Sequence, residues 1–478
     1  MKKILFVGAE VMPFAATGGL GDVLGSLPAA LAAQSRELDI RVVMPLYAAV
    51  SEKFRDEMKT IAVFDVHLAW RRQYCGVRRL IRDGVTYYFI DNEYYFARDT
   101  LYGHMDDGER YAYFCRAVLE MMPFIDFYPD VLHAHDWQAA LSVIYYKRQF
   151  AQQEKYAGAE TVFTIHNIAY QGIFGFDTLH DVFALSDEDG PLLDYDGQIN
   201  LMKAAIVCAD RVTTVSPHYA QEILTPEYSH RLHYILRDNT EKLCGILNGI
   251  DYVYYNPAAA NDVIVSPFDS AHLENKIPNK TALQKELGLP VRADVPMLAI
   301  ISRLASHKGL DLVTQIAYRL LEDNDVQLVV LGKGEAQFER FFRELEQNLP
   351  DRVRALMLYD RDLSKRIYAA CDIFLMPSRS EPCGLSQMIA SRYGAIPVVR
   401  ETGGLYDSIK GYWEDADGNP HGNGFTFANY SSAELLERAN AAIRLWNDPP
   451  RREALVKRIM ETDFSWNSSA REYLRLYQ

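Results

Sequence analysis

The sequence has 478 residues, a length that fits about three domains of roughly 150 residues, or two large α/β domains. Lys and Arg total 50 against 64 Asp and Glu, so the formal net charge is −14, with 49% hydrophobic and 24% charged residues. These proportions exclude a disordered or collagen-like chain, and the acidic balance argues against a nucleic-acid partner. Any anionic ligand would have to meet a local cluster of Arg, Lys or backbone N–H groups.

The cysteines and the N-terminus indicate a soluble, cytoplasmic protein with no membrane partner. The apolar run Ile4–Ala9 after two lysines resembles a secretory signal, but Glu10 ends it before the roughly 7–15 residues that a signal core needs. No run approaches the roughly 20 apolar residues that span a bilayer. The cysteines form no C-x-x-C pair, and a reducing compartment is the simplest interpretation. They are Cys75, Cys115, Cys208, Cys244, Cys371 and Cys383.

In chain order, the first half alternates predicted strands and helices. Lys3–Gly8 is a short apolar run closed by glycine, and a glycine-rich loop leads into a helical pattern from Leu20 to about Ala33. A second strand is predicted at Ile40–Met44. This strand–loop–helix–strand unit is typical of a parallel sheet with helices on both faces. Further strands are predicted at Val85–Ile90, Val131–Ala134, Thr161–Thr164 and Arg211–Val215.

The same pattern restarts in the second half. The Asn-Gly and Asn-Pro turn signals of Gly245–Pro257 mark the junction. The sequence therefore predicts two α/β domains, residues 1–245 and 246–450, followed by a helical tail, 451–478, whose parent domain the pattern leaves open. The strands predicted for the second domain are Met297–Ile301, Val326–Leu331, Ala355–Tyr359, Ile373–Met376 and Ile396–Val399.

Two segments share the pattern T-G-G-L-x-D, Thr17–Asp22 and Thr402–Asp407. In doubly wound sheets the carboxyl ends of strands carry the ligand loops. Gly18 and Gly19 precede a predicted helix, where backbone N–H groups could approach an anion, but a tight turn accounts for them equally well. The loop is neither a dinucleotide fingerprint nor a P-loop. The repeat indicates either a shared ligand-binding role or a coincidence.

Two cations and one carboxylate follow strands of the second half. Arg303 and Lys308 could converge on one diphosphate at a helix start, or they could be solvated surface charges. Glu381 lies in a loop constrained by Pro382. Its carboxylate could accept hydrogen bonds from sugar hydroxyls and balance positive charge at an anomeric carbon, or it could cap the next helix.

Histidines end two strands of the first half. His133 and His135 suggest zinc only weakly, because further ligands at suitable spacing are missing, and residues on one face of a strand also fit a core. His166 at a strand end favours a hydrogen-bond donor to a bound ligand. No Asp-x-Asp pair has a convincing metal-binding context, so no metal is expected.

Taken in order, seven motifs resemble those of bacterial glycogen synthases and plant starch synthases, the retaining glucosyltransferases of glycosyltransferase family 5. The resemblance implies an α/β GT-B fold, with two Rossmann-like doubly wound domains facing across a deep cleft. It also implies transfer of glucose from ADP-glucose to the non-reducing end of an α-1,4-glucan (glycogen or a maltooligosaccharide), without a cofactor. The motifs are TGGLGDVLGSLP, HAHDW, HNIAYQG, LNGID, SRLASHKGLD, PSRSEPCGLSQM and TGGLYDS.

By resemblance, four residues would be catalytic. Arg303 and Lys308 would neutralise the leaving diphosphate, Glu381 would hold the donor glucose hydroxyls, and His166 would lie near the 6-hydroxyl. Gly18 and Gly19 would contact the donor phosphates, Gly403 and Gly404 the diphosphate or sugar, Asp136 the glucose or acceptor, and Asn248 and Tyr359 the hinge and adenine pocket. The full set of implied substrate-binding residues is Gly18, Gly19, Asp22, Asp136, Asn167, Asn248, Tyr359, Cys383, Gly384, Leu385, Gly403 and Gly404.

The sequence departs from the family pattern in three places. Ala16 replaces the lysine that usually precedes T-G-G-L, so one expected cation is missing. Ser380 stands where many members have an aromatic residue, and the loop Tyr228–His233 lacks the usual glycines. The alternatives to an ADP-glucose-dependent synthase are a GT-B transferase using another sugar nucleotide, such as UDP-glucose, and a non-catalytic glucan-binding protein.

Overall fold

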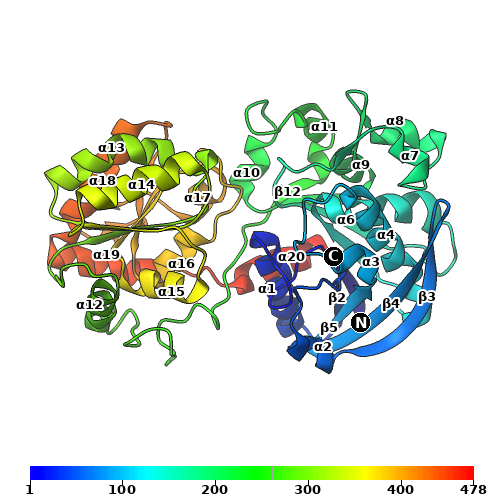
Figure 1. The fold of residues 1–478 in the computed structure, drawn as a ribbon, viewed down its shortest axis with the longest axis horizontal. Coiled ribbons are helices and arrows are strands. Elements are labelled where there is room, and N and C mark those ends of the chain that lie inside the picture. Colours follow the sequence, from blue (N-terminus) through cyan, green and yellow to red (C-terminus); the bar gives the residue numbers. More distant parts are fainter. Residues whose placement is uncertain (261) are drawn as a thin grey trace. The chain divides into compact units, whose positions relative to one another are not determined.

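The computed structural model describes residues 1–260 and 262–478 and consists of two compact units (Figure 1). Unit 1 comprises Met1–Gly249 and Trp466–Gln478, and unit 2 comprises Ile250–Ser465. The chain enters unit 2 shortly after the predicted boundary at 245/246 and returns to unit 1 near its end. The predicted tail 451–478 is divided, because α19 (Pro449–Glu461) lies in unit 2 and α20 (Trp466–Leu476) lies in unit 1.

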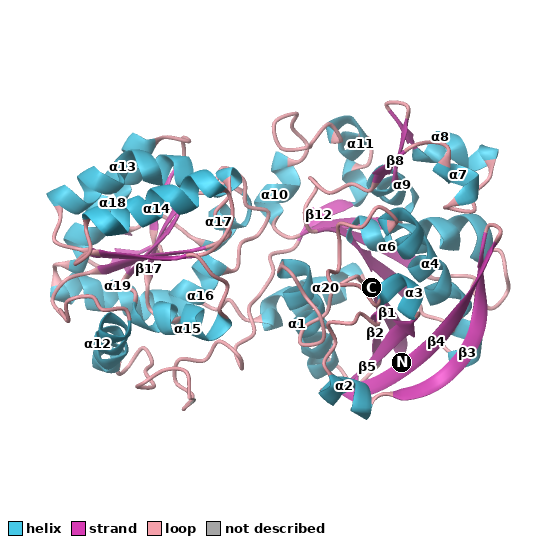
Figure 2. Cartoon of the chain, viewed as in Figure 1, coloured by secondary structure: helices cyan, strands magenta, loops and turns pink. Residues whose placement is uncertain are grey.

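Unit 1 is built on a largely parallel sheet (Figure 2). Its central strand pairs in parallel with a neighbour on each side, and Ile4–Val7 of that strand are fully buried. A continuous apolar run is what a strand covered on both faces requires. The strands, in sheet order, are β12 (Leu243–Gly245), β11 (Arg211–Thr214), β7 (Glu160–Ile165), β6 (Val131–His135), β1 (Lys2–Val7), β2 (Leu38–Pro45), β5 (Val85–Asp91), β4 (Arg71–Arg82) and β3 (Lys59–Leu68).

One edge of this sheet is an antiparallel hairpin that the sequence did not predict. β4 pairs in antiparallel register with both β3 and β5, and the register shifts between Thr60 and Ala62. β4 reads RRQYCGVRRLIR, and its arginines obscure the apolar alternation of a half-buried strand. The hairpin therefore extends unit 1 beyond its parallel strands.

Helices cover the large sheet of unit 1, and the unit also contains a separate three-stranded sheet. Its strands are β8 (Ile173–Phe174), β10 (Gln198–Asn200) and β9 (Asp194–Tyr195). The α-helices are α1 (Gly19–Gln34), α2 (Glu52–Glu57), α3 (Glu93–Phe96), α4 (Asp107–Glu120), α5 (Met122–Ile125), α6 (Asp136–Tyr145), α7 (Thr178–Asp181), α8 (Gly190–Leu193), α9 (Leu201–Cys208), α10 (Pro217–Glu222), α11 (His233–Arg237) and α20. A π-turn, Tyr146–Phe150, continues α6, and short 3₁₀ turns lie at Asp187–Asp189 and Thr240–Lys242.

Unit 2 contains a fully parallel sheet, as a doubly wound domain predicts. The strand predicted at 355–359 is in fact β15, which ends at Leu356, so Tyr359 lies in the loop beyond it. The strands, in sheet order, are β15 (Val353–Leu356), β14 (Gln327–Leu331), β13 (Met297–Ile301), β16 (Ile373–Met376), β17 (Ile396–Arg400) and β20 (Phe425–Phe427). A two-stranded ribbon joins β18 (Trp413–Glu414) to β19 (Pro420–His421).

Helices lie on both faces of the second sheet. Its remaining elements are α12 (Lys276–Glu286), α13 (Leu310–Asp323), α14 (Ala336–Asn348), α15 (Arg361–Ala370), α16 (Ser386–Arg392), α17 (Gly403–Ser408) and α18 (Ser432–Trp446), with 3₁₀ turns at Leu273–Asn275 and Ser306–Lys308. Figure 1 shows α13, α14 and α18 on one face and α12, α15, α16 and α19 on the other. Within the described residues, no helix combines the length and the apolar character needed to cross a bilayer.

Candidate functional site

A buried glutamate organises the glycine loop between β1 and α1. Glu10 is 4% exposed, and its carboxylate accepts hydrogen bonds from the N–H of Thr17 (2.5 Å), the hydroxyl of Thr17 (2.7 Å), the N–H of Gly18 (3.1 Å) and the hydroxyl of Tyr102 (2.6 Å). The N–H of Gly18 is therefore directed to Glu10. The sequence reasoning missed this role, although a charged residue inside an apolar run was its signal.

The two glycines of this loop are exposed. A Cβ atom on Gly18 or Gly19 would meet no atom within 4 Å, so the protein's own packing does not require either glycine. Ala16 packs against the start of α1, because a Cβ on Gly21 would lie 2.3 Å from the Cβ of Ala16. Asp22 lies in the first turn of α1, where a carboxylate interacts favourably with the helix dipole.

Three histidines lie close together where β6 and β7 end. His135 Nδ1 and His166 Nε2 share a hydrogen bond of 2.8 Å, and the rings of His133 and His135 stack at 4.2 Å. His133 is bonded to the hydroxyls of Tyr477 (2.7 Å) and Thr164 (2.6 Å). These two hydrogen bonds engage both ring nitrogens of His133. No group of three or more His, Cys, Asp or Glu among the described residues is arranged to hold a metal ion.

Burial controls the charge of this cluster. It lowers the pKa of His166 to about 3 and that of His135 well below the usual value for histidine, so both rings are neutral near pH 7. Burial also raises the pKa of Asp136 to about 7, against backbone N–H groups of His166 and Asn167 that stabilise the carboxylate. One of those bonds, from the N–H of His166 to Asp136 Oδ1, is 2.7 Å long.

Two asparagines complete the predicted positions of unit 1. Asn167 Oδ1 accepts the N–H of Ala169 at 3.0 Å, which fixes the turn after His166. Asn248 is 5% exposed, and its Oδ1 has no hydrogen-bond partner within the described part of the chain. Asn248 immediately precedes Gly249, the last residue before the chain enters unit 2. It therefore lies where the chain leaves unit 1, and its role at a hinge stays a prediction.

In unit 2, the loops after β13 and β16 bring Lys308 and Glu381 together. Lys308 Nζ donates to Glu381 Oε2 at 2.7 Å, and the hydroxyl of Ser378 donates to the same oxygen at 3.0 Å. Glu381 is 6% exposed. Gly309 permits this approach, because its φ is +73° and a Cβ there would lie 1.9 Å from the carbonyl oxygen of Pro377. Arg303 lies on the first of these loops with an exposed side chain.

The second glycine pair packs against the loop that carries Glu381. A Cβ on Gly403 would lie 2.0 Å from the carbonyl oxygen of Glu381, and one on Gly404 would lie 2.1 Å from that of Cys383. The N–H of Gly404 donates to the carbonyls of Glu381 and Pro382, both at 3.1 Å. These glycines are buried, whereas Gly18 and Gly19 are exposed. The shared T-G-G-L-x-D pattern thus has a different structural basis in each unit.

A buried glutamine fixes the rest of this loop. Gln387 Nε2 donates to the carbonyls of Cys383 (3.2 Å) and Gly384 (2.9 Å) and to the hydroxyl of Ser408 (3.0 Å). Gly384 has a φ of +73°, and a Cβ there would lie 2.6 Å from Gln387 Oε1. Leu385 is the N-cap residue of α16. Sequence reasoning missed Gln387, since a glutamine in a helix carries no distinctive signal.

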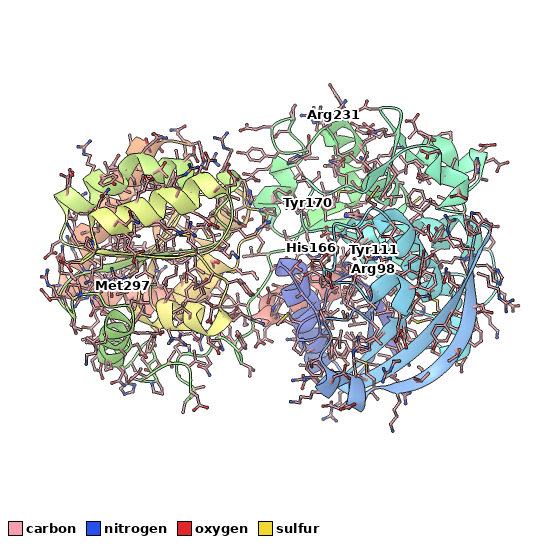
Figure 3. All side chains as sticks on the ribbon, viewed as in Figure 1. Arg98, Tyr111, His166, Tyr170, Arg231 and Met297 are labelled. Carbon is pink, nitrogen blue, oxygen red and sulfur yellow. The ribbon has the colours of Figure 1, made fainter. Side chains whose placement is uncertain are left out.

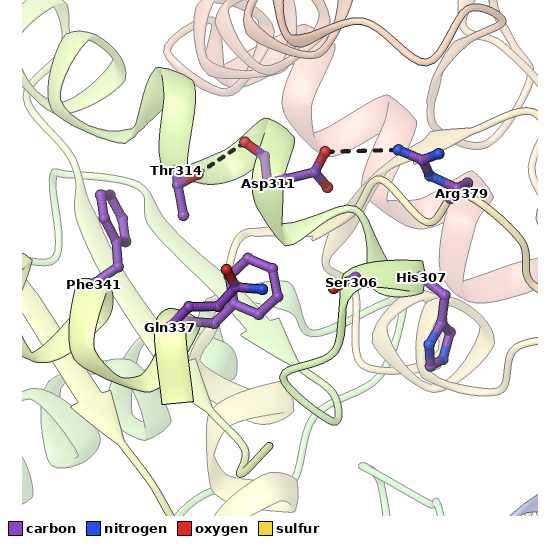
Figure 4. Close-up of a pocket in the computed structure, with 8 residues that line it drawn as sticks. Ser306, His307, Asp311, Thr314, Gln337, Phe341 and Arg379 are labelled. Carbon is purple, nitrogen blue, oxygen red and sulfur yellow. Dashed lines mark hydrogen bonds and ion pairs between the residues drawn. The ribbon is translucent and has the colours of Figure 1, made fainter. Parts of the chain in front are cut away.

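A pocket of about 640 Å³ lies beside these loops (Figure 4). Arg379 lies 3.9 Å from Asp311 at this pocket. Its lining residues are Ser306, His307, Asp311, Thr314, Gln337, Phe338, Phe341 and Arg379. The predicted site residues Arg303, Lys308 and Glu381 are not among them. Tyr359, also outside this lining, is 85% exposed, which leaves its ring accessible at the carboxyl edge of the sheet.

Two Rossmann-like domains with polar loops at the carboxyl ends of their strands define a GT-B glycosyltransferase architecture. The family model "Starch synthase catalytic domain" matches residues 3–238, and "Glycosyl transferases group 1" matches residues 285–461. Glycogen synthase from Anoxybacillus flavithermus is 46% identical over 99% of this chain and 97% of its own length. Glycogen synthase from Bacillus subtilis is 45% identical over 100% of this chain and 98% of its own length. The chain therefore belongs to the glycogen synthase and starch synthase family of glucan-elongating glucosyltransferases.

Solved structures agree with this assignment. The catalytic domain of starch synthase IV from Arabidopsis thaliana, bound to ADP and acarbose, has a TM-score of 0.90 and 34% identity, over 100% of this chain and 98% of that one. Sucrose-phosphate synthase from Thermosynechococcus elongatus shares the fold. Its TM-score is 0.61, and it is 18% identical, over 100% of this chain and 98% of that one. The predicted family, fold and enzyme class are confirmed, and the roles of individual residues stay predictions.

Proposed function

We propose that this chain transfers glucose from ADP-glucose to the non-reducing end of an α-1,4-glucan, with retention of anomeric configuration. The observation that carries the proposal is the pair of the partly buried Lys308 and the buried Glu381, 2.7 Å apart at the carboxyl edge of a parallel sheet. Such edges are where open α/β sheets bind ligands. The names of the glycogen synthase relatives and the ADP and acarbose bound to starch synthase IV support this donor and acceptor.

The charges in unit 2 suit an anionic donor. Lys308 and the exposed Arg303 supply positive charge for the leaving diphosphate in an acidic chain, and fixed cations stabilise charge that develops in a transition state. Glu381, bonded to Lys308 and Ser378, is held in place to accept hydrogen bonds from glucose hydroxyls. With these two cations at the diphosphate, the reaction needs no metal and no other cofactor.

We favour front-face attack over a covalent glycosyl–enzyme. Glu381 is already engaged by an ammonium and a hydroxyl, which makes it a poor nucleophile. In this route the bond from the anomeric carbon to the diphosphate oxygen breaks while a bond to the acceptor hydroxyl oxygen forms on the same face. The hydroxyl proton passes to the leaving phosphate oxygen, and ADP is released. A cytoplasmic location is proposed as well, supported by six free cysteines.

The test is incorporation of labelled glucose into glycogen from ADP-glucose and UDP-glucose, side by side. Lys308→Ala and Glu381→Gln should each lower kcat by about 100-fold or more, the cost of losing one fixed charge-stabilising group. Lys457→Ala, which removes an exposed lysine paired with Glu453, is the matched control and should leave kcat unchanged. Incorporation from neither donor by the unaltered protein would overturn the activity, and a preference for UDP-glucose would overturn the donor.

A further inference from the structure

The hydrogen bond between His135 and His166 restricts where each ring carries its proton. His166 Nε2 faces His135 Nδ1 at 2.8 Å, and both rings are neutral because burial disfavours the charged form. A neutral imidazole has one N–H and one acceptor nitrogen. One ring must therefore donate across this contact and the other must accept, which fixes the proton on the far nitrogen of the accepting ring.

The surroundings of His135 decide between the two arrangements. His135 is fully buried, and its Nε2 has no hydrogen-bond partner among the described residues. If His166 donated, this Nε2 would carry a buried N–H without an acceptor. If His135 donates, the same Nε2 is an unfilled acceptor. Orphaned buried N–H groups are rarer than under-satisfied acceptors, so donation by His135 is favoured.

The ring of His135 packs against two other aromatic rings, those of His133 and Phe6. It stacks on His133 at 4.2 Å with an interplanar angle of 27°, and Phe6 stacks on it at 5.7 Å. Hydrogen bonds to Tyr477 and Thr164 occupy both nitrogens of His133. His135 therefore lies in a packed layer in which its ring plane is fixed. His166, labelled in Figure 3, directly follows β7 and is partly exposed.

We propose that His135 is a positioning residue that donates its Nδ1–H to His166 Nε2, and thereby holds the proton of His166 on Nδ1 for donation to a sugar hydroxyl. The second half of this statement rests on the proposed function, and the tautomer itself does not. Within the described residues, no hydrogen bond engages Nδ1 of His166, so that N–H is available to a ligand. With the opposite tautomer, His166 would offer an acceptor there.

Two substitutions separate donor from acceptor at one position. The side-chain nitrogen of Asn overlays Nδ1 of histidine, so His135→Asn retains a donor to His166, whereas His135→Asp presents only an acceptor. His135→Leu, which removes the bond without adding a buried charge, replaces the Asp variant if that variant does not fold. His180→Asn is the control, because His180 is an exposed histidine outside this cluster. The readouts are ¹⁵N–¹H NMR of the His166 ring and the separate values of kcat and KM.

We expect the NMR spectra of the unaltered protein and of His135→Asn to show the proton of His166 on Nδ1. In His135→Asp or His135→Leu it should move to Nε2, with kcat/KM for ADP-glucose about tenfold lower, the value of one lost hydrogen bond of about 1.4 kcal/mol. A proton on Nε2 in the unaltered protein would overturn the proposal, whatever the activity. If the proton is on Nδ1 and the protein transfers no glucose, the tautomer stands and the proposed function fails.

Discussion

Gly403 and Gly404 hold the Glu381 loop because they lack side chains. Each allows a carbonyl oxygen of the loop to approach to about 2 Å from where a Cβ would be. Gly18 has a φ of −164°, an extended conformation open to any residue, and space around it. At the scale of single residues, the fold therefore requires Gly403 and Gly404. Gly18 and Gly19 instead leave a surface that a ligand can approach.

We expect Gly404→Ala to lower the free energy of unfolding of unit 2 by about 1–3 kcal/mol, because the methyl group would overlap the carbonyl of Cys383. Gly18→Ala should change stability by less than about 0.5 kcal/mol and raise KM for ADP-glucose if phosphates contact this loop. Urea unfolding and initial-rate kinetics measure both. A Gly404→Ala protein as stable as the unaltered one would contradict the packing argument.

The sequence singled out candidate residues that follow strands, and missed those that hold them. Lys308 and Glu381 were candidates because they follow predicted strands, and the family resemblance gave them roles that stay predictions. Glu10 and Gln387 were not, since their role depends on which backbone groups the folded loops bring near them. The Lys308–Glu381 pair itself joins residues far apart in the sequence, and spacing carries no information about such a contact.

At the scale of elements, α12 joins the ends of two other helices through one buried lysine. Lys276 Nζ donates to the carbonyls of Tyr368 (3.2 Å) and Ala369 (2.9 Å) near the end of α15 and of Tyr393 (2.7 Å) after α16. A cation at helix C-termini interacts favourably with their dipoles. Burial nevertheless lowers the pKa of Lys276 to about 8, since the charged form loses water there.

Lys276→Met should lower the free energy of unfolding by about 2–4 kcal/mol, because three buried carbonyls lose their donor. The lowered pKa of Lys276 also determines whether stability rises or falls with pH. Between about pH 8 and the ordinary lysine pKa near 10.4, the unfolded chain binds more protons, so this group makes stability rise with pH. The rise should be absent in Lys276→Met and present in Lys285→Met, which alters an exposed residue of the same helix. Urea titrations from pH 7 to 10.5 test this, and equal slopes would contradict it.

Elements were predictable to the extent that their residues are continuously apolar. β1, β6, β13 and β16 fall within two residues of their predicted ranges, because strands buried on both faces leave an unbroken apolar run. The hairpin β3–β4 was missed because arginines occur on both faces of β4, from the buried Arg71 to the exposed Arg72, and obscure its apolar alternation. The range predicted for β15 was too far along the chain, because the apolar stretch continues into the loop that carries Tyr359. Periodicity cannot distinguish a strand from the loop that extends it.

At the scale of the whole molecule, the last residues of the chain complete the domain that the first residues begin. α20 belongs to unit 1, and Tyr477, 1% exposed, bonds His133 within the sheet. The ammonium of Lys2 donates to the carbonyl of Tyr477. The helical pattern of the tail predicted α20, but its amphipathic face would fit either domain, so the sequence left its location open.

Tyr477→Phe should lower the free energy of unfolding of unit 1 by about 0.5–1.5 kcal/mol, the net value of one buried hydrogen bond. Deleting residues 466–478 should cost far more, because it also exposes the apolar surface of α1 that α20 covers. Deleting only Gln478, which is exposed, is the control. Limited proteolysis of the N-terminal half reports each change. Equal resistance of the control and of the chain without α20 would show that unit 1 does not depend on its C-terminal helix.

The return of α20 also has a consequence for biosynthesis. A ribosome makes unit 1 almost entirely before it starts unit 2, and domains generally fold in that order. Here the first domain lacks one helix until α20 has been translated, whereas the second, uninterrupted from Ile250 to Ser465, is complete earlier. We therefore expect the order of folding to be the reverse of the order of synthesis. A chain that terminated before α20 would carry an unfinished first domain and be open to proteases, so only chains that include α20 would persist.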